Sequence, residues 1–97
     1  MKTIKLVRDN AKERYPNDTF KDVDTDMHRV LLLKKLHEEV EEISRDQTDI
    51  LEYADVYECL KVLAALNGIT MEQIVYFAEK KAKVKGSFEK GVVWVKN

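Results

Sequence analysis

The chain has 97 residues, of which 44% are hydrophobic, so it is long enough for one domain with a modest core and too apolar for a disordered protein. Charged residues reach 36%, but their signs almost cancel to a net charge of -1, which excludes the basic field of a nucleic-acid-binding protein and a long acidic tail. The single cysteine, Cys59, excludes an intrachain disulfide and a cysteine-based zinc site.

The amino-terminal quarter predicts an extended arm, a short helical turn and a polar loop. Residues 1–7 alternate weakly between apolar and polar side chains and lack the apolar core of a signal peptide. Residues 10–15 favour a helical turn that ends at Pro16, and residues 17–25 form the polar loop. Because no apolar run approaches the roughly 20 residues of a membrane span, we expect a cytoplasmic protein with neither membrane nor nucleic-acid partners.

Two long amphipathic helices are predicted next. The first begins with a cap at Thr25 or Asp26 and runs to about residue 45, and the second runs from a cap at Thr48 or Asp49 to the stop signal Asn67-Gly68. The polar residues between them predict a short connection.

A third helix opens with a capping box between Thr70 and Gln73 and ends at Lys85-Gly86. Its inward-facing residues are expected to be Ile74, Phe77 and Ala78. The tail, residues 87–97, favours an extended segment that either pairs with the arm as a small ribbon or wraps the helices. We therefore expect a single all-α domain over residues 1–97: an antiparallel helical hairpin plus a third helix, with a short extended arm and a tail. Short connections predict antiparallel neighbours.

Four acids stand out on the two long helices. On a helical wheel, the buried stripe of the first helix contains Leu32, Leu33, Leu36, Val40 and Ile43. Glu39 and Glu42 lie on one flank of this stripe, and Glu38 lies on the far face. Glu52 and Asp55 lie inside the apolar stripe of the second helix. Carboxylates in an apolar stripe carry a desolvation cost unless another group compensates them. In an antiparallel hairpin centred on residue 47, position 42 is level with 52 and position 39 with 55, so the four carboxylates converge. A hard divalent cation such as Mg²⁺ or Mn²⁺ relieves the resulting repulsion.

Either acid pair taken alone also fits a solvated surface or salt bridges to Lys34, Lys35 or Lys61. The hypothesis of a metal site therefore depends on the matched spacing of the two pairs.

The acidic segments also resemble a known family. Residues 38–42, EEVEE, followed by residues 52–55, EYAD, resemble the EExxE…ExxD signature of the all-α nucleoside triphosphate pyrophosphohydrolases. That superfamily includes MazG-like enzymes, dimeric dUTPases and phosphoribosyl-ATP pyrophosphohydrolase. Residues 5–10 and 86–90 resemble the opening and closing segments of its phosphoribosyl-ATP pyrophosphohydrolase-like branch, and residues 11–25 match least.

The resemblance implies Mg²⁺-dependent cleavage between the α and β phosphates of a nucleotide, which gives a nucleoside monophosphate and pyrophosphate. It assigns Glu39, Glu42, Glu52 and Asp55 as metal ligands, with Mn²⁺ as a substitute for Mg²⁺. Glu38 and Glu39 are the expected catalytic residues, and Glu38 would orient a water or support a second metal. The resemblance also implies a homodimer or homotetramer in which helices of several subunits complete a core of the four-helix-bundle type.

A triphosphate needs cationic groups besides a metal. The expected phosphate ligands lie in the arm and around Gly86: Arg8, Lys5, Lys83, Lys85 and Lys90. The leading hypothesis is an enzyme that cleanses the nucleotide pool. The alternatives are a phosphoribosyl-ATP pyrophosphohydrolase of histidine biosynthesis and a non-catalytic helical oligomerisation or regulatory module.

Overall fold

Four helices make up the regular structure of residues 4–97, which are the residues that the computed structural model describes. In chain order they are α1 (Ala11–Arg14), α2 (Thr25–Arg45), α3 (Ile50–Leu66) and α4 (Met71–Lys85). No strand occurs in this range, so the predicted all-α class is confirmed. The predicted arm begins at Met1–Thr3, which lie outside the described residues. No helix of the described range has both the length and the apolar character needed to cross a bilayer.

The side chains of aspartates fix the starts of the two long helices. Asp24 caps α2, because its carboxylate accepts a hydrogen bond from the Met27 amide at 2.8 Å. This cap lies one residue before the earlier of the two expected ones, Thr25. Asp49 caps α3 by accepting a hydrogen bond from the Leu51 amide at 2.9 Å, as predicted.

The connection between α2 and α3 is held by its own polar groups. Asp46 Oδ1 accepts hydrogen bonds from the Thr48 hydroxyl at 2.8 Å and the Thr48 amide at 3.1 Å. These two bonds lower the pKa of Asp46, because they favour its charged form. The Tyr53 hydroxyl donates to the Gln47 carbonyl at 2.9 Å. The turn therefore fixes which residues of α2 and α3 face each other.

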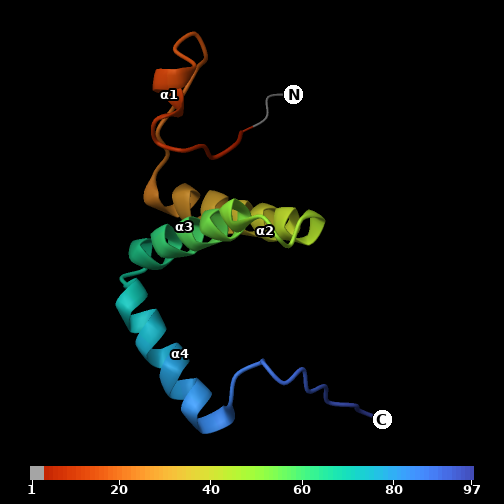
Figure 1. Cartoon of the computed structure of the whole chain (residues 1–97). Coiled ribbons are helices and arrows are strands. Elements are labelled where there is room, and N and C mark those ends of the chain that lie inside the picture. The colour runs from red at the N-terminus through yellow and green to blue at the C-terminus, as the bar shows by residue number, and fades with distance from the viewer. Residues whose placement is uncertain (1–3) are drawn as a thin grey trace.

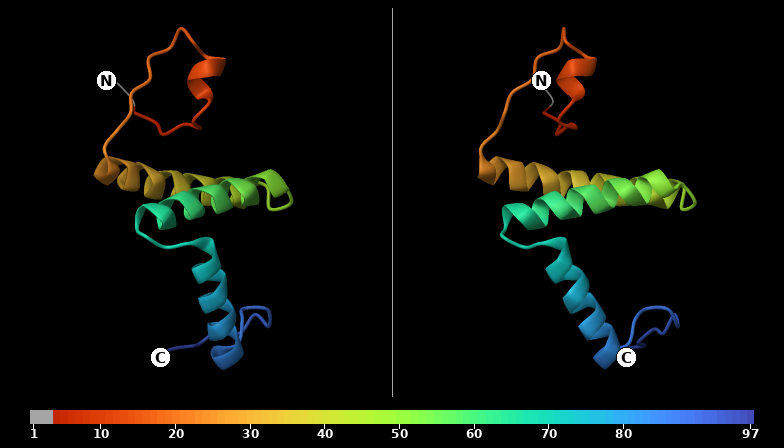
Figure 2. Two further views of the ribbon diagram at one scale, coloured as in Figure 1. Left: turned by 90° about the vertical axis from the view of Figure 1, so that its left-hand side faces the viewer. Right: turned by 60° about the vertical axis from the view of Figure 1, so that its left-hand side comes forward.

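The hairpin of α2 and α3 is the only pair of described helices with extensive contact, and the two run antiparallel (Figures 1 and 2). Leu32 on α2 and Ala64 on α3 are buried in it. Leu33 and Val40, which the helical wheel placed in the buried stripe, remain 50% and 52% exposed. That part of the prediction is wrong, because α3 packs along the neighbouring line of α2 that contains Leu32 and Glu39.

Helix α4 begins with the predicted capping box. The Thr70 hydroxyl accepts from the Gln73 amide at 3.1 Å, and the Gln73 side chain accepts from the Thr70 amide at 2.9 Å. The helix then leads away from the hairpin instead of folding back along it (Figure 2). The predicted antiparallel neighbourhood is therefore wrong for α4, and Phe77 and Ala78, expected to face inward, are exposed. The turn that redirects the chain contains Gly68 at a φ of 76°.

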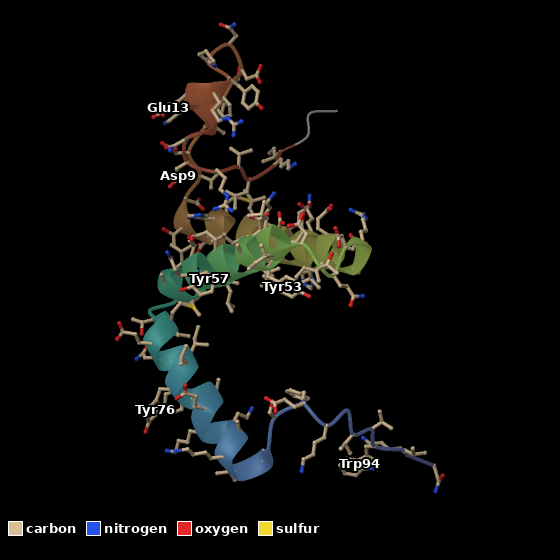
Figure 3. The ribbon with its side chains drawn as sticks, viewed as in Figure 1. Asp9, Glu13, Tyr53, Tyr57, Tyr76 and Trp94 are labelled. Atoms are coloured by element: carbon tan, nitrogen blue, oxygen red, sulfur yellow. The ribbon has the colours of Figure 1, made fainter. Side chains whose placement is uncertain are left out.

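The tail after α4 is irregular and does not form a ribbon with the described part of the arm. Trp94 lies in this tail, away from the helices, and is 85% exposed (Figure 3). The predicted ribbon is therefore not formed by residues 4–97. A valine-rich segment without a neighbouring strand cannot satisfy its backbone groups through a ladder.

The isolated chain is extended. Its accessible surface is 9211 Å², whereas a compact monomer of this mass exposes roughly 5,700 Å². Its radius of gyration is 17.2 Å, against about 12.5 Å for a compact domain of this length. The arm and α1 lie on one side of the hairpin, and α4 extends from the other side (Figure 1).

Candidate metal centre

Three of the four predicted acids meet between α2 and α3. One carboxylate oxygen each of Glu39, Glu52 and Asp55 lies within 4.8 Å of the others, and we call these residues the acid cluster. Glu39 is buried at 8% exposure, while Glu52 and Asp55 are half-buried. The cluster forms because the short connection places residue 39 of α2 opposite residues 52–55 of α3.

Burial, together with the negative charges around it, raises the pKa of Glu52. The largest cause is burial of the carboxyl group, followed by the negative charges of Asp49, Glu42, Glu39 and Asp55. Glu52 has no ion-pair partner among the described residues. It is therefore the member of the cluster whose negative charge is least compensated.

Two cations contact the other members. Lys35 lies one turn before Glu39 on α2, and its Nζ is 3.2 Å from Glu39 Oε1. Arg8 comes from the arm, 47 residues from Asp55 in sequence, and its Nη2 is 2.5 Å from Asp55 Oδ1. Three carboxylates thus face two cations, so that the cluster keeps a net negative charge.

The fourth predicted ligand, Glu42, lies outside the acid cluster. Its carboxylate forms an ion pair with Arg45, one turn further along α2. Glu42 is still close enough to contribute to the raised pKa of Glu52. In this arrangement Glu42 adds negative potential to the site without joining the group of converging oxygens.

A small cavity of about 90 Å³ lies beside the acid cluster, between the arm and α2. The predicted catalytic residue Glu38 and the predicted phosphate ligand Lys5 both line it. The other lining residues are Ile4, Leu6, Leu31, Lys34 and Lys35. Lys35 therefore borders both the cavity and the cluster, and the arm shields Glu38, which the helical wheel had placed on the far face.

The remaining predicted phosphate ligands are distant from the cluster in the single chain. Lys83 and Lys85 lie in the last turn of α4, and Lys90 lies in the tail. Arg8 brings the arm to the cluster, whereas α4 leaves the hairpin on the opposite side (Figure 1). Phosphate binding by these three lysines stays a prediction.

Of the two ion pairs at the cluster, the one between Lys35 and Glu39 could be predicted from the sequence and the one between Arg8 and Asp55 could not. Lys35 and Glu39 are four residues apart on a helix, a spacing typical of ion pairs, and Lys35 was among the expected salt-bridge partners. The contact of Arg8 with Asp55 has no comparable local signal. It depends on the path of the arm over the hairpin.

Cys59 lies one helical turn after Asp55 and is half-buried with a free thiol. Burial and the negative charge of Glu39 raise the pKa of this thiol, while Lys35 and Arg8 oppose the shift. A protonated thiol beside the cluster is suited to packing and unsuited to nucleophilic chemistry.

The chemistry of the acid cluster fits a hard divalent cation. All three donors are carboxylates carried by two packed helices. Their oxygens lie within 4.8 Å of one another, so these three residues would hold a cation that prefers oxygen ligands.

Comparison of the chain with protein-family models, with curated proteins and with solved structures gave no match.

Proposed function

We propose that the protein is a Mg²⁺-dependent nucleotide pyrophosphohydrolase that cleaves a nucleoside triphosphate between its α and β phosphates and cleanses the cytoplasmic nucleotide pool. The observation that carries the proposal is the convergence of Glu39, Glu52 and Asp55, which occupy the motif positions EExxE…ExxD, within 4.8 Å. Carboxylates repel one another, so their convergence at a helix interface favours a cation bound between them.

Different residues of the site would have different roles in this reaction. Glu39, Glu52 and Asp55 would hold Mg²⁺, which when bound supplies charge neutralisation for the triphosphate and an aligned water. Lys35 fixes the orientation of Glu39 through its ion pair. Glu38, which lines the adjoining cavity, is placed to accept a proton from a water in that cavity.

Cationic side chains of the arm provide the first contacts for phosphate. Lys5 lines the cavity beside Glu38, and Arg8 lies at the edge of the acid cluster on Asp55. The Arg8 guanidinium presents several donors in one plane, which suits phosphate oxygens. We propose that these two side chains bind the phosphates next to the metal.

Exposed apolar surface supports the further proposal that the active form is a homo-oligomer. The chain exposes about 3,500 Å² more surface than a compact monomer, which exceeds the 1,200–2,000 Å² of an ordinary stable interface. Large exposed apolar side chains lie on α2, α3, α4 and the tail: Val30, Leu33, Val40, Tyr53, Tyr57, Val75, Phe77 and Trp94. An assembly would also give Lys83, Lys85 and Lys90 a route to the hairpin of a second copy.

The decisive experiment measures pyrophosphate release from a panel of canonical, deoxy and modified triphosphates, with phosphoribosyl-ATP included, in the presence of Mg²⁺. We expect equimolar monophosphate and pyrophosphate from at least one triphosphate. Turnover of phosphoribosyl-ATP alone would assign the protein to histidine biosynthesis instead. Absence of turnover across the panel would contradict an enzymatic function.

A non-catalytic helical module is the second candidate, and a specific observation favours it. Three of the four motif acids already have cationic partners within the chain: Glu39 with Lys35, Asp55 with Arg8 and Glu42 with Arg45. These cationic partners offset part of the repulsion among the acids, which favours a site that is stable without a metal. Thermal unfolding with and without Mg²⁺ or Mn²⁺ separates the two candidates, since an ion at a hundred times its Kd adds about 2.7 kcal/mol to the free energy of unfolding.

A further inference from the structure

The arm reaches the acid cluster through a single charged contact. Arg8 Nη2 lies 2.5 Å from Asp55 Oδ1, and the two side chains are 67% and 37% exposed. No other ion pair joins the described part of the arm, residues 4–10, to the helices. Because this contact is exposed to water, it holds the arm weakly and can exchange with other partners.

Arg8 and a divalent cation in the acid cluster would both bind the Asp55 carboxylate. Its Oδ1 accepts from Arg8, and an oxygen of the same carboxylate lies within 4.8 Å of oxygens of Glu39 and Glu52. A guanidinium at that carboxylate also repels a second cation at this distance. The ion pair between Lys35 and Glu39 does not connect the arm to the cluster, because both residues lie on α2.

We propose that Arg8 and a divalent cation compete for Asp55, so that cation binding releases the arm and frees Arg8. This inference rests on the proposed function, since it assumes that the acid cluster binds the ion. Arg8 then has two successive roles. It is a counter-ion of Asp55 before the cation binds and a free guanidinium beside the metal afterwards.

The two roles predict opposite effects for one substitution. Arg8→Gln should tighten Mn²⁺ binding about two- to fivefold, the range that corresponds to loss of one competing exposed ion pair. The same substitution should raise the KM for a triphosphate, because a phosphate ligand is lost. If Arg8 had a purely structural role, Arg8→Gln would weaken both Mn²⁺ binding and triphosphate binding. Arg14→Gln, on α1 and outside the cluster, should change neither.

The test combines calorimetric titration of Mn²⁺ into metal-free full-length protein with limited trypsin digestion. Trypsin must take the Arg8 side chain into its own pocket, so cleavage after Arg8, relative to cleavage after Arg14, reports release of the arm. We expect Mn²⁺ to increase this ratio in the wild type. Asp55→Asn should give the high ratio without Mn²⁺, because the neutral amide no longer pairs with Arg8.

Two results would overturn the proposal in distinguishable ways. The competition is refuted if the wild type and Arg8→Gln bind Mn²⁺ with equal affinity and Mn²⁺ does not change the cleavage ratio. The metal site would stand in that case. If neither protein binds Mn²⁺, both the competition and the proposed function fail. The digestion of Asp55→Asn would then still report whether Arg8 anchors the arm.

Discussion

Glu39 is the one charged residue that is buried in the described part of the protein. It is a carboxylate at the interface of two helices, buried to 8% exposure, and its ion-pair partner is Lys35 on the same helix. The ion pair with Lys35 offsets only part of the cost of burying the Glu39 carboxylate, because an apolar side chain at this interface would carry no such cost. Residues with that property are candidates for function rather than for stability.

The first prediction concerns the charge of the acid cluster. Asp55→Asn should abolish pyrophosphate release while retaining the helical fold, because the amide keeps the shape of the side chain and removes a metal ligand. Activity assays and far-ultraviolet circular dichroism measure the two outcomes. Glu41→Gln, which neutralises an exposed acid of α2 outside the acid cluster, is the control and should retain activity. Full activity of Asp55→Asn would show that Asp55 is not a metal ligand.

The second prediction follows from the raised pKa of Glu52. A carboxyl group whose pKa is raised by folding destabilises the folded state when it is charged, so metal-free protein should gain stability as the pH falls through that raised pKa. Glu52→Gln should therefore have a higher Tm than the wild type at pH 7 in a chelator. The difference should vanish once the pH is below 4.5, the ordinary value for the group, because both proteins are then neutral at this position. A lower Tm for Glu52→Gln at pH 7 would contradict this account of the cluster.

At the scale of the elements, the hairpin and α4 depend on different forces. The hairpin is stabilised by packing of α2 on α3 and by the hydrogen bonds of its connection. Helix α4 has no such packing within the described chain, so its stability depends on its own caps and propensity. An isolated helix of its length, 15 residues, is marginal in water.

The third prediction tests this dependence of α4. Thr70→Ala removes the hydroxyl that accepts from the Gln73 amide and should cost about 1 kcal/mol of helix stability. The measurement is amide hydrogen exchange, in which residues 71–85 should lose protection while α2 and α3 retain theirs. Thr70→Ser keeps the cap and is the control. Uniform loss of protection over all helices would show that α4 and the hairpin unfold together.

At the scale of the whole molecule, the exposed apolar side chains outnumber those in the core. Only Leu32 and Ala64 are buried hydrophobic residues within the described chain, whereas residues such as Val40, Tyr57 and Trp94 face solvent. Figure 3 shows Tyr53 and Tyr57 on the hairpin and Tyr76 on α4, each at the surface. Burial of this apolar surface against another chain would add hydrophobic stabilisation.

The fourth prediction is that association depends on the exposed face of α2. Val40→Glu should shift the protein from an oligomer to a monomer in sedimentation velocity experiments, because a charge would be buried at the subunit interface. Val23→Glu makes the same chemical change in the loop before α2 and should leave the oligomer intact. A wild-type protein that sediments as a monomer at all concentrations would refute the proposed assembly.

Structural features that depend only on neighbouring residues could be predicted from the amino-acid sequence. The helices, the Asp49 cap and the Thr70–Gln73 capping box follow from local chemistry, and the spacing of Glu39, Glu52 and Asp55 predicted their convergence once a short connection was assumed. Periodicity and capping need no knowledge of distant residues, which explains why these predictions agree with the structure.

Features that depend on contacts between distant residues could not be predicted from the sequence. A helical wheel gives directions around one helix, but the face that meets a neighbour is set by the connection, so Leu33 and Val40 were assigned to the core while Glu39 occupies the contact line. The divergence of α4 and the contact of Arg8 with Asp55 join or separate residues far apart in sequence. Those outcomes depend on the path of the whole chain, which no local pattern specifies.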